Sequence, residues 1–225
     1  MKLIHKDFDF NYDFKENKQG LLVVESPCLF RYFVIDILEG NEGKFVLSEN
    51  NVVVDISKNL LCVIDYFNIS INERKILTKL NEIIKNEVLN SELFAEASKL
   101  CGKIEKFSDE ICKTLDYSLE YNKKPDITSL IKYLDLKFIE SSINRLECLV
   151  DYLKINSEIL GIRVFLFVNL MSYFNAYEIS KLLEFTNYNK INILLLENKM
   201  PETITGFDMV YILDKDCCQI SLNDL

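Results

Sequence analysis

The feature that most constrains this chain is a change in the spacing of its apolar residues. Up to about residue 64, and again after Gly161, apolar residues come in short continuous runs, which are typical of strands buried on both faces of a sheet. Between residues 72 and 160 they recur every three or four positions, as on one face of a helix. The two patterns together predict an α/β fold interrupted by a long helical insertion.

We therefore predict a discontinuous α/β head over residues 1–65 and 161–225 and a helical arm over residues 66–160. With 225 residues, 49% hydrophobic and 27% charged, the chain has the length and composition to bury a full core. The N-terminus, Met1 to Lys6, lacks the apolar segment and cleavage site of a secretory signal, and no apolar run approaches a membrane span. We expect a cytoplasmic protein with no membrane partner.

The head is predicted to contain a mainly parallel sheet. Its predicted strands are residues 21–24, 45–47, 52–56, 60–64, 164–168, 191–196 and 210–213. Ser26 and Pro27 are expected to start a helix that ends near Leu38, and a second head helix is expected over residues 176–185. Strands that alternate with helices in this way are typical of a buried parallel sheet.

The arm is predicted to contain coiled-coil-like helices. One seam alternates by four and three: Leu93, Ala97, Leu100, Ile104, Phe107 and Ile111. A later seam repeats that spacing, so the two helices are expected to pack antiparallel: Ile139, Ile143, Leu146, Val150 and Leu153. Between them, residues 122–125 break the pattern, and Asp126 is a candidate N-cap for a short helix through Leu134.

Four predicted strands are followed by, or end on, polar residues: Glu25, Asn169, Glu197 and Asp214. Ligands bind beyond the carboxyl ends of parallel strands, so this edge is where an enzyme would work. The turn after the first strand, residues 25–28, holds neither glycine nor lysine and is unsuited to cradle a phosphate. The polar residues either simply end strands, which we favour, or three of them, Glu25, Glu197 and Asp214, bind the metal of a nuclease.

Other catalytic mechanisms have few residues available. His5 is the only histidine and lies near the N-terminus, where we expect it on the surface. This disfavours Ser-His-Asp and Cys-His catalysis as well as histidine-based metal sites. The seven cysteines form no CxxC pair and are expected to be free, buried thiols. We predict no catalytic residue.

The charge of the chain is unevenly distributed. A formal net charge of -9 argues against a uniformly basic nucleic-acid binder. Residues 66–160, however, carry 14 Lys and Arg against 16 Asp and Glu, whereas the remainder carries 12 against 19. The acidity therefore lies mainly outside the middle of the chain.

Four lysines share one face of the second arm helix, roughly 120° from its apolar seam: Lys99, Lys103, Lys106 and Lys113. One interpretation is a solvated face with ion pairs to Glu92, Glu96 and Glu110. The other is contact with phosphates, which needs positive charge but no base-reading residues. Lys75 and Lys79 on the preceding helix would extend this DNA-binding face.

Three carboxylates lie close together in sequence where the arm pattern breaks: Asp116, Glu120 and Asp126. Hard oxygen ligands of this kind suit calcium. Lys123 and Lys124 lie in the same loop, and Asp126 already has a capping role, so capping and solvent exposure are the alternative.

Short motifs in the last third of the chain carry a resemblance to a known family. They are Phe167-Val168-Asn169, Ser172-Tyr173-Phe174, Glu178-Ile179, Leu183-Glu184 with Thr186, Leu194 to Glu197, and Leu213-Asp214-Lys215-Asp216. Weaker similarity runs through LLVVE near the start and LEYNKKPDITSLIKYL in the middle. In these motifs the chain resembles the short form of the Csn-two family of type II-A CRISPR-associated proteins.

This resemblance implies a degenerate P-loop-type α/β head with a helical insertion, assembled as a homotetrameric ring. Members of the family thread double-stranded DNA ends through a lysine-lined hole, bind calcium and have no known enzymatic activity. They serve spacer acquisition together with the integrase subunits and the type II effector nuclease. By analogy Glu120 and Asp126 are the main calcium candidates and Asp116 is a secondary one, although this sequence departs from the family there by carrying an expanded loop with two lysines.

We therefore predict a non-catalytic, sequence-independent binder of double-stranded DNA ends. A ring would also reconcile an acidic outer surface with a positive inner wall. One alternative is a metal-dependent nuclease or vestigial nucleotide hydrolase that uses the strand-end carboxylates. Another is an interaction scaffold that recruits proteins through its acidic head.

Overall fold

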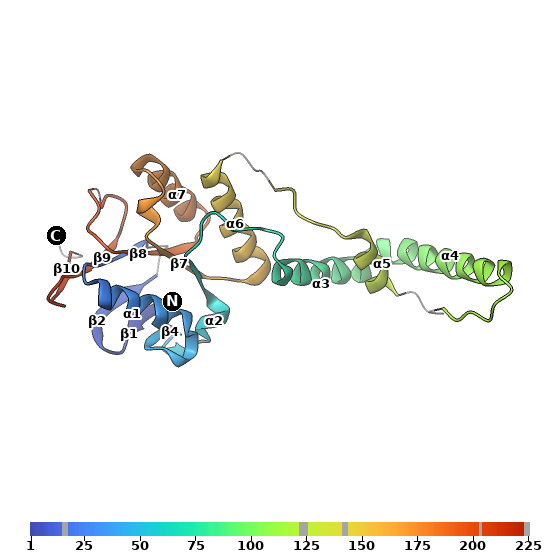
Figure 1. Cartoon of the computed structure of the whole chain (residues 1–225), viewed down its shortest axis with the longest axis horizontal. Helices are drawn as coiled ribbons and strands as arrows, with labels where there is room; N and C mark the ends of the chain where they lie inside the picture. The colour runs from blue at the N-terminus through green and yellow to red at the C-terminus, as the bar shows by residue number, and fades with distance from the viewer. Residues whose placement is uncertain (15–17, 122–125, 141–143, 203, 223–225) are drawn as a thin grey trace. The chain divides into compact units, whose positions relative to one another are not determined.

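The computed structural model describes residues 1–14, 18–121, 126–140, 144–202 and 204–222, which form two compact units (Figure 1). The α/β unit comprises residues 1–70 and 141–225, and the helical unit comprises residues 71–140. Residues 66–70 and 141–160, which the sequence pattern assigned to the arm, thus group with the α/β unit. Within the described ranges, no helix is both long and apolar enough to cross a membrane.

The α/β unit is built from two sheets and the helices that flank them. Its strands are β1 (Lys2–His5), β2 (Phe8–Asp13), β3 (Gly20–Val24), β4 (Phe45–Glu49), β5 (Val52–Val53), β6 (Leu60–Val63), β7 (Val164–Val168), β8 (Asn192–Glu197), β9 (Met209–Leu213) and β10 (Gln219–Ser221). Its helices are α1 (Pro27–Leu38), α2 (Ile56–Asn59), α6 (Arg145–Leu160) and α7 (Ala176–Tyr188), with short 3-10 turns η2 (Gly40–Glu42) and η3 (Leu170–Ser172).

The larger sheet is the mainly parallel sheet that the apolar runs predicted. Among the described residues its strand order is β10-β9-β3-β8-β7-β6. Every pairing from β9 to β6 is parallel, and only the edge strand β10 runs antiparallel to its neighbour. All residues of β3 and β7 are buried, which explains why their sequences show no polar alternation.

Both faces of the larger sheet are covered. Alternate residues on one face, such as Leu22, Leu194 and Leu166, join a single core with side chains from β1, β2, β4 and α1. On the other side of the sheet lie α6 and α7 (Figure 1), which bury Leu153 and Leu182 among others. The unit is therefore three-layered, with the larger sheet in the middle.

The smaller sheet was only partly predicted. Its order is β2-β1-β4-β5, antiparallel throughout, and neither β1 nor β2 was expected. The predicted strand over residues 52–56 is wrong at its end, because Asp55 accepts a hydrogen bond from the backbone N–H of Ser57 at 3.0 Å and caps α2. Ile56 consequently begins a helix.

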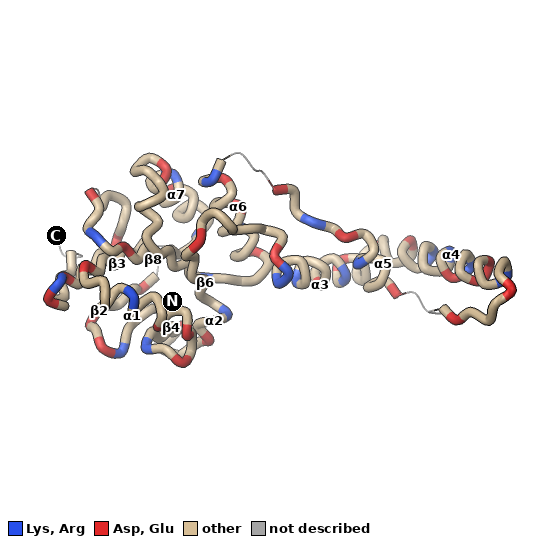
Figure 2. The backbone as a smooth tube through the Cα atoms, viewed as in Figure 1, with Lys and Arg blue, Asp and Glu red and all other residues tan. Residues whose placement is uncertain are grey.

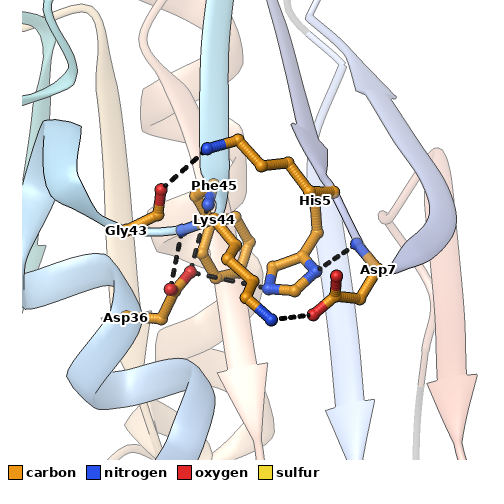
Figure 3. A network of polar contacts seen from close by, with 7 residues as sticks. His5, Asp7, Asp36, Gly43, Lys44 and Phe45 are labelled. Atoms are coloured by element: carbon orange, nitrogen blue, oxygen red, sulfur yellow. Dashed lines mark hydrogen bonds and ion pairs between the residues drawn. The ribbon is translucent and has the colours of Figure 1, made fainter.

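His5, expected on the surface, is only 3% exposed and belongs to a polar network between β1, α1 and β4 (Figure 3). Its Nδ1 accepts a hydrogen bond from the backbone N–H of Asp7 at 3.1 Å, and its Nε2 lies 3.5 Å from Asp36 Oδ2. Burial lowers the pKa of His5, and the nearby Asp36 carboxylate opposes that shift. The prediction was wrong because residues 2–5 form a strand in which Leu3 and His5 both face the core, and this short alternating pattern is a weak sequence signal.

Asp36 fixes the start of β4. Its Oδ1 accepts a hydrogen bond from the backbone N–H of Lys44 at 2.7 Å, and its Oδ2 accepts one from Phe45 at 3.0 Å. The side chain is 4% exposed, so these two donors have no ready replacement in water. Asp36 thereby joins α1 to the smaller sheet.

The helical unit consists of α3 (Arg74–Asn90), α4 (Leu93–Thr114) and α5 (Ile127–Leu134) among its described residues. Helix α3 contacts both α4 and α5. The two ends of the unit are joined where Asn72 Oδ1 accepts a hydrogen bond from the Phe138 backbone N–H at 2.9 Å. Asp126 caps α5 as predicted, accepting from the backbone N–H of Ser129 at 2.8 Å.

The two arm seams that were predicted to pack antiparallel belong to different units. On α4 the buried residue is Ala97, whereas the rest of the predicted seam is exposed: Leu93, Leu100, Ile104, Phe107 and Ile111. The later helix begins only at Arg145 and buries Leu149 and Leu153 within the α/β unit. Ile139 is exposed. Ile143 of the later seam and the predicted break at residues 122–125 lie outside the described residues.

The cysteines are all free, as predicted, but not all are buried. Cys28, Cys217 and Cys218 are exposed, and the remaining four are partly exposed. Cys217 and Cys218 are exposed because they lie in a turn beyond β9, outside the buried strand.

Replacing Asp36 by alanine should destabilise the protein by about 2–4 kcal/mol, because it leaves one buried and one part-buried backbone N–H group without an acceptor. Urea unfolding followed by circular dichroism would measure the loss. Asp7→Ala is the matched control: Asp7 pairs with Lys44 at the surface, and its removal should cost less than about 1 kcal/mol. Equal losses for the two variants would contradict this role of Asp36.

Candidate functional site

One face of α4 carries the four predicted lysines, all exposed: Lys99, Lys103, Lys106 and Lys113. We call this set the α4 lysine face. At 100° per residue it lies roughly opposite the packed side of α4, which contains Ala97 and Cys101. With a rise of 1.5 Å per residue, the face extends about 21 Å from Lys99 to Lys113, or about six base pairs of duplex DNA.

The α4 lysine face has no ion pair with any residue that the structure describes. Among the described residues, none of its four ammonium groups is in an ion pair within 4.0 Å of a carboxylate. Figure 2 shows basic and acidic residues interspersed along α4, and the ion pairs expected with Glu92, Glu96 and Glu110 are not formed. These lysines are therefore available to an external anion.

The two additional lysines on α3 are already engaged. Lys75 Nζ lies 3.3 Å from Glu73 Oε2, and Lys79 Nζ lies 2.9 Å from Glu82 Oε2. Each pair is solvent-exposed and worth little energy, so an anion can compete for the lysine. We still expect Lys75 and Lys79 to contribute less than the α4 lysine face.

The predicted calcium ligands are not assembled into a site in the part of the chain that the structure describes. There, no group of three or more His, Cys, Asp or Glu side chains is placed to hold a metal ion. Asp116 and Glu120 are exposed, and the hydrogen bond from Ser129 to Asp126 lowers the pKa of the Asp126 carboxyl. The loop lysines Lys123 and Lys124 lie outside the described residues. Calcium binding stays a prediction.

The strand-end carboxylates do lie at one edge of the larger sheet, because β3 pairs with both β8 and β9. Their hydrogen bonds, however, serve the backbone. Asp214 Oδ1 accepts from the N–H groups of Asp216 at 2.9 Å and Cys218 at 2.8 Å, closing a turn. Asn169, in the left-handed conformation, accepts from the N–H of Asn198 at 3.1 Å. This favours the interpretation that these residues end strands.

Glu197 is the exception, because its carboxyl is buried at the end of β8. It accepts a hydrogen bond from the backbone N–H of Met171 at 3.1 Å, but burial dominates and raises its pKa to about 7. The side chain borders a cavity of about 560 Å³ that is also lined by η3 and the start of α7. Among the described residues, no metal-binding group is formed by Glu25, Glu197 and Asp214. The metal centre that the nuclease alternative requires is therefore not assembled there.

The turn after β3 is as short as the sequence indicated. Only Glu25 and Ser26 separate the end of β3 from Pro27, where α1 begins. The backbone therefore forms no extended loop whose N–H groups could surround a phosphate. A P-loop-type ancestry of the head stays a prediction.

One feature of the α/β unit was not predicted: an aromatic pocket beyond β6 and β7 that includes Tyr66, Phe67, Tyr173 and Phe174. The signal was present, since each pair of aromatic residues follows soon after a buried apolar run.

Comparison with known families settles the relationship that the motifs indicated. A family model described as CRISPR-associated protein (Cas_Csn2) matches residues 38–217. The chain belongs to this family. The match extends across both units, from the end of α1 to the turn after β9.

Among solved structures, the chain is similar to cbiO1 from Clostridium perfringens, part of the ABC transporter complex cbiONQ. The similarity covers 93% of this chain and 79% of that chain, with 10% sequence identity and a TM-score of 0.44. At this TM-score the likeness carries no argument about this protein.

Replacing Glu197 by glutamine should remove a pH dependence of stability. Because the folded-state pKa is raised to about 7 from the ordinary 4.5, the folded state binds the extra proton, and wild-type stability increases as pH falls from 8 to 5. We expect Glu197→Gln to exceed the wild type by about 1–3 kcal/mol at pH 8 and to match it near pH 5. Urea unfolding at both pH values tests this, with Glu25→Gln as the control that should leave the pH dependence unchanged.

Proposed function

We propose that this protein is a non-catalytic, sequence-independent binder of double-stranded DNA ends that acts as a homotetrameric ring in CRISPR adaptation. The α4 lysine face carries the proposal. It presents four exposed lysines that form no ion pair within 4.0 Å in the part of the chain that the structure describes. Phosphate contacts need charge and spacing and do not read base sequence, so such a face suits binding without sequence preference.

Family membership supports the biological setting. The match to the CRISPR-associated family supports a role in adaptation, and the motif resemblance adds DNA ends as the ligand. In that role the protein would act in the cytoplasm, with the integrase subunits and the type II effector nuclease as partners.

The exposed apolar residues of α4 support self-association. Leu100, Ile104 and Phe107 are 44%, 42% and 63% exposed and lie along one side of the helix, roughly 120° around its axis from the α4 lysine face. A contiguous apolar patch of this kind is typical of a protein interface. If copies of α4 pack through it, lysine faces from different copies come close together despite the acidic total of the chain.

Calcium is proposed as a further ligand, with Asp116, Glu120 and Asp126 as candidates. Because the described residues do not bring these carboxylates together, no step of the proposed function depends on the ion.

Changing the four lysines of the α4 lysine face to glutamine should weaken binding of linear duplex DNA by at least about tenfold. The slope of log affinity against log salt should fall by about 3–4, since each lost phosphate contact releases about 0.9 fewer counterions. Fluorescence anisotropy across a salt series measures both quantities. The control changes four exposed lysines of the α/β unit, Lys58, Lys154, Lys199 and Lys215, to glutamine and should leave the slope nearly unchanged.

The same experiment compares linear DNA with a closed circle of identical sequence. Wild-type protein should prefer the linear form, because a ring can load only from an end. Equal binding of the two forms, or equal effects of the two quadruple variants, would refute the proposed mode of binding.

Leu100→Glu with Ile104→Glu should dissociate the oligomer while leaving the fold intact, because both side chains are already partly exposed within one chain. Analytical ultracentrifugation should show a shift to smaller species, and thermal unfolding should confirm that each chain remains folded. Tyr133→Glu on α5, where the side chain is 85% exposed, is the control that should keep the wild-type assembly. An unchanged sedimentation profile for the double variant would exclude this surface as the interface.

A further inference from the structure

The aromatic pocket of the α/β unit has a volume of about 540 Å³ and lies where β6 and β7 end. It is lined by Tyr66, Phe67, Asn144, Arg145, Tyr173, Phe174 and Glu178. The carboxyl edge of a parallel sheet is where ligands bind in this class of fold, and a cavity of this size can hold a small planar group.

The rings form a supported stacking surface. Tyr66 is buried and donates a hydrogen bond from its hydroxyl to the Val168 carbonyl oxygen at 2.8 Å, which fixes its position. Tyr173 lies against Tyr66 with 5.5 Å between ring centroids, and Phe67 lies 5.5 Å from Tyr173 with an interplanar angle of 86°. Phe67 and Tyr173 are nonetheless 55% and 56% exposed, so each presents ring surface outward.

Backbone turns hold the two exposed rings in place. Asp65 Oδ1 accepts hydrogen bonds from the N–H groups of Phe67 at 3.0 Å and Asn68 at 3.2 Å, which orders the segment after β6. The N–H of Tyr173 donates to the Leu170 carbonyl oxygen at 3.0 Å at the end of η3. Little conformational entropy is therefore lost when a flat ligand stacks on these rings.

The pocket lining carries one basic and one acidic side chain, Arg145 and Glu178, and the basic one has no ion-pair partner among the described residues. Arg145 is exposed and, among the described residues, is in no ion pair within 4.0 Å. The one carboxylate of the lining, Glu178, accepts a hydrogen bond from the Asn175 N–H at 2.8 Å as part of the capping box of α7. An aromatic surface next to an unpaired guanidinium fits a ligand that is both planar and anionic.

We propose that this pocket binds an unpaired nucleotide at the end of the DNA, with the base stacked on the face of one exposed ring, Phe67 or Tyr173, against the edge of the other, and a phosphate contacted by Arg145. The inference rests on the proposed binding of DNA ends. Paired bases are already stacked within the duplex, so only a nucleotide in a single-stranded tail can present its face to the rings. The duplex brings the tail to the pocket at high local concentration, which a free nucleotide lacks.

The test compares a blunt duplex with the same duplex carrying a single-stranded tail of about four nucleotides, at the 3′ or the 5′ end. Fluorescence anisotropy with the full-length protein should show about tenfold tighter binding of at least one tailed duplex. Phe67→Ala with Tyr173→Ala should abolish this preference while leaving the affinity for blunt DNA within about twofold. The variants Phe67→Tyr and Tyr173→Phe keep the rings and should keep the preference.

Arg145→Gln should weaken binding of the tailed duplex about threefold and reduce its salt slope by about 0.7, the value for one single-strand phosphate. Tyr188→Ala is the matched aromatic control, because Tyr188 is 88% exposed on α7 of the same unit but does not line the pocket. It should behave as wild type with both duplexes.

The outcomes separate the two proposals. Equal wild-type affinity for blunt and tailed DNA, or a preference that survives loss of both rings, overturns the pocket and leaves DNA-end binding intact. Binding of tailed but not blunt DNA supports the pocket and overturns binding of double-stranded ends. Absence of binding to either duplex overturns both. If a free mononucleotide displaced the tailed duplex at concentrations similar to those at which the tailed duplex binds, the assignment of the pocket to a DNA end would be overturned.

Discussion

A mainly parallel sheet whose central strands are buried on both faces is the constraint on which the rest of this structure depends. Every residue of β3 and β7 is buried, so the chain must supply a covering layer on each side. Helices α6 and α7 cover one side, and α1 with the smaller sheet covers the other. The edge formed by the strand ends is thereby left as the region of the sheet that is open to ligands.

This constraint explains what could be read from sequence and what could not. Strands buried on both faces are continuous apolar runs, and β3, β7, β8 and β9 were predicted close to their observed bounds. The smaller sheet has one buried face, and its alternation in residues such as Phe8, Phe10 and Tyr12 is a weaker signal over so few positions. Helix α6 was assigned to the arm from sequence, because a helical spacing of apolar residues does not indicate which hydrophobic core the helix packs against.

The candidate site likewise has one part that sequence predicts and another part that only the structure shows. The α4 lysine face follows from helical geometry alone, so its residues could be named before the structure was known. Whether Lys79 pairs with Glu82 while Lys103 pairs with no described carboxylate depends on side-chain positions that sequence does not give. The aromatic pocket could not be assembled from sequence, because Phe67 and Tyr173 are about a hundred residues apart and meet only through the pairing of β6 with β7.

That same pairing has a consequence for how the chain folds. Leu60 of β6 lies opposite Val164 of β7, so the whole helical unit is a loop closed by two adjacent strands. Loop-closure entropy grows only with the logarithm of length, at about 0.6 kcal/mol for each doubling, so inserting a unit of this size costs little equilibrium stability. The contacts within α3, α4 and α5 are local, and those between β6 and β7 are distant, which favours early formation of the insertion and late closure of the sheet. An insertion at this point of the fold can therefore differ in length with small effect on equilibrium stability.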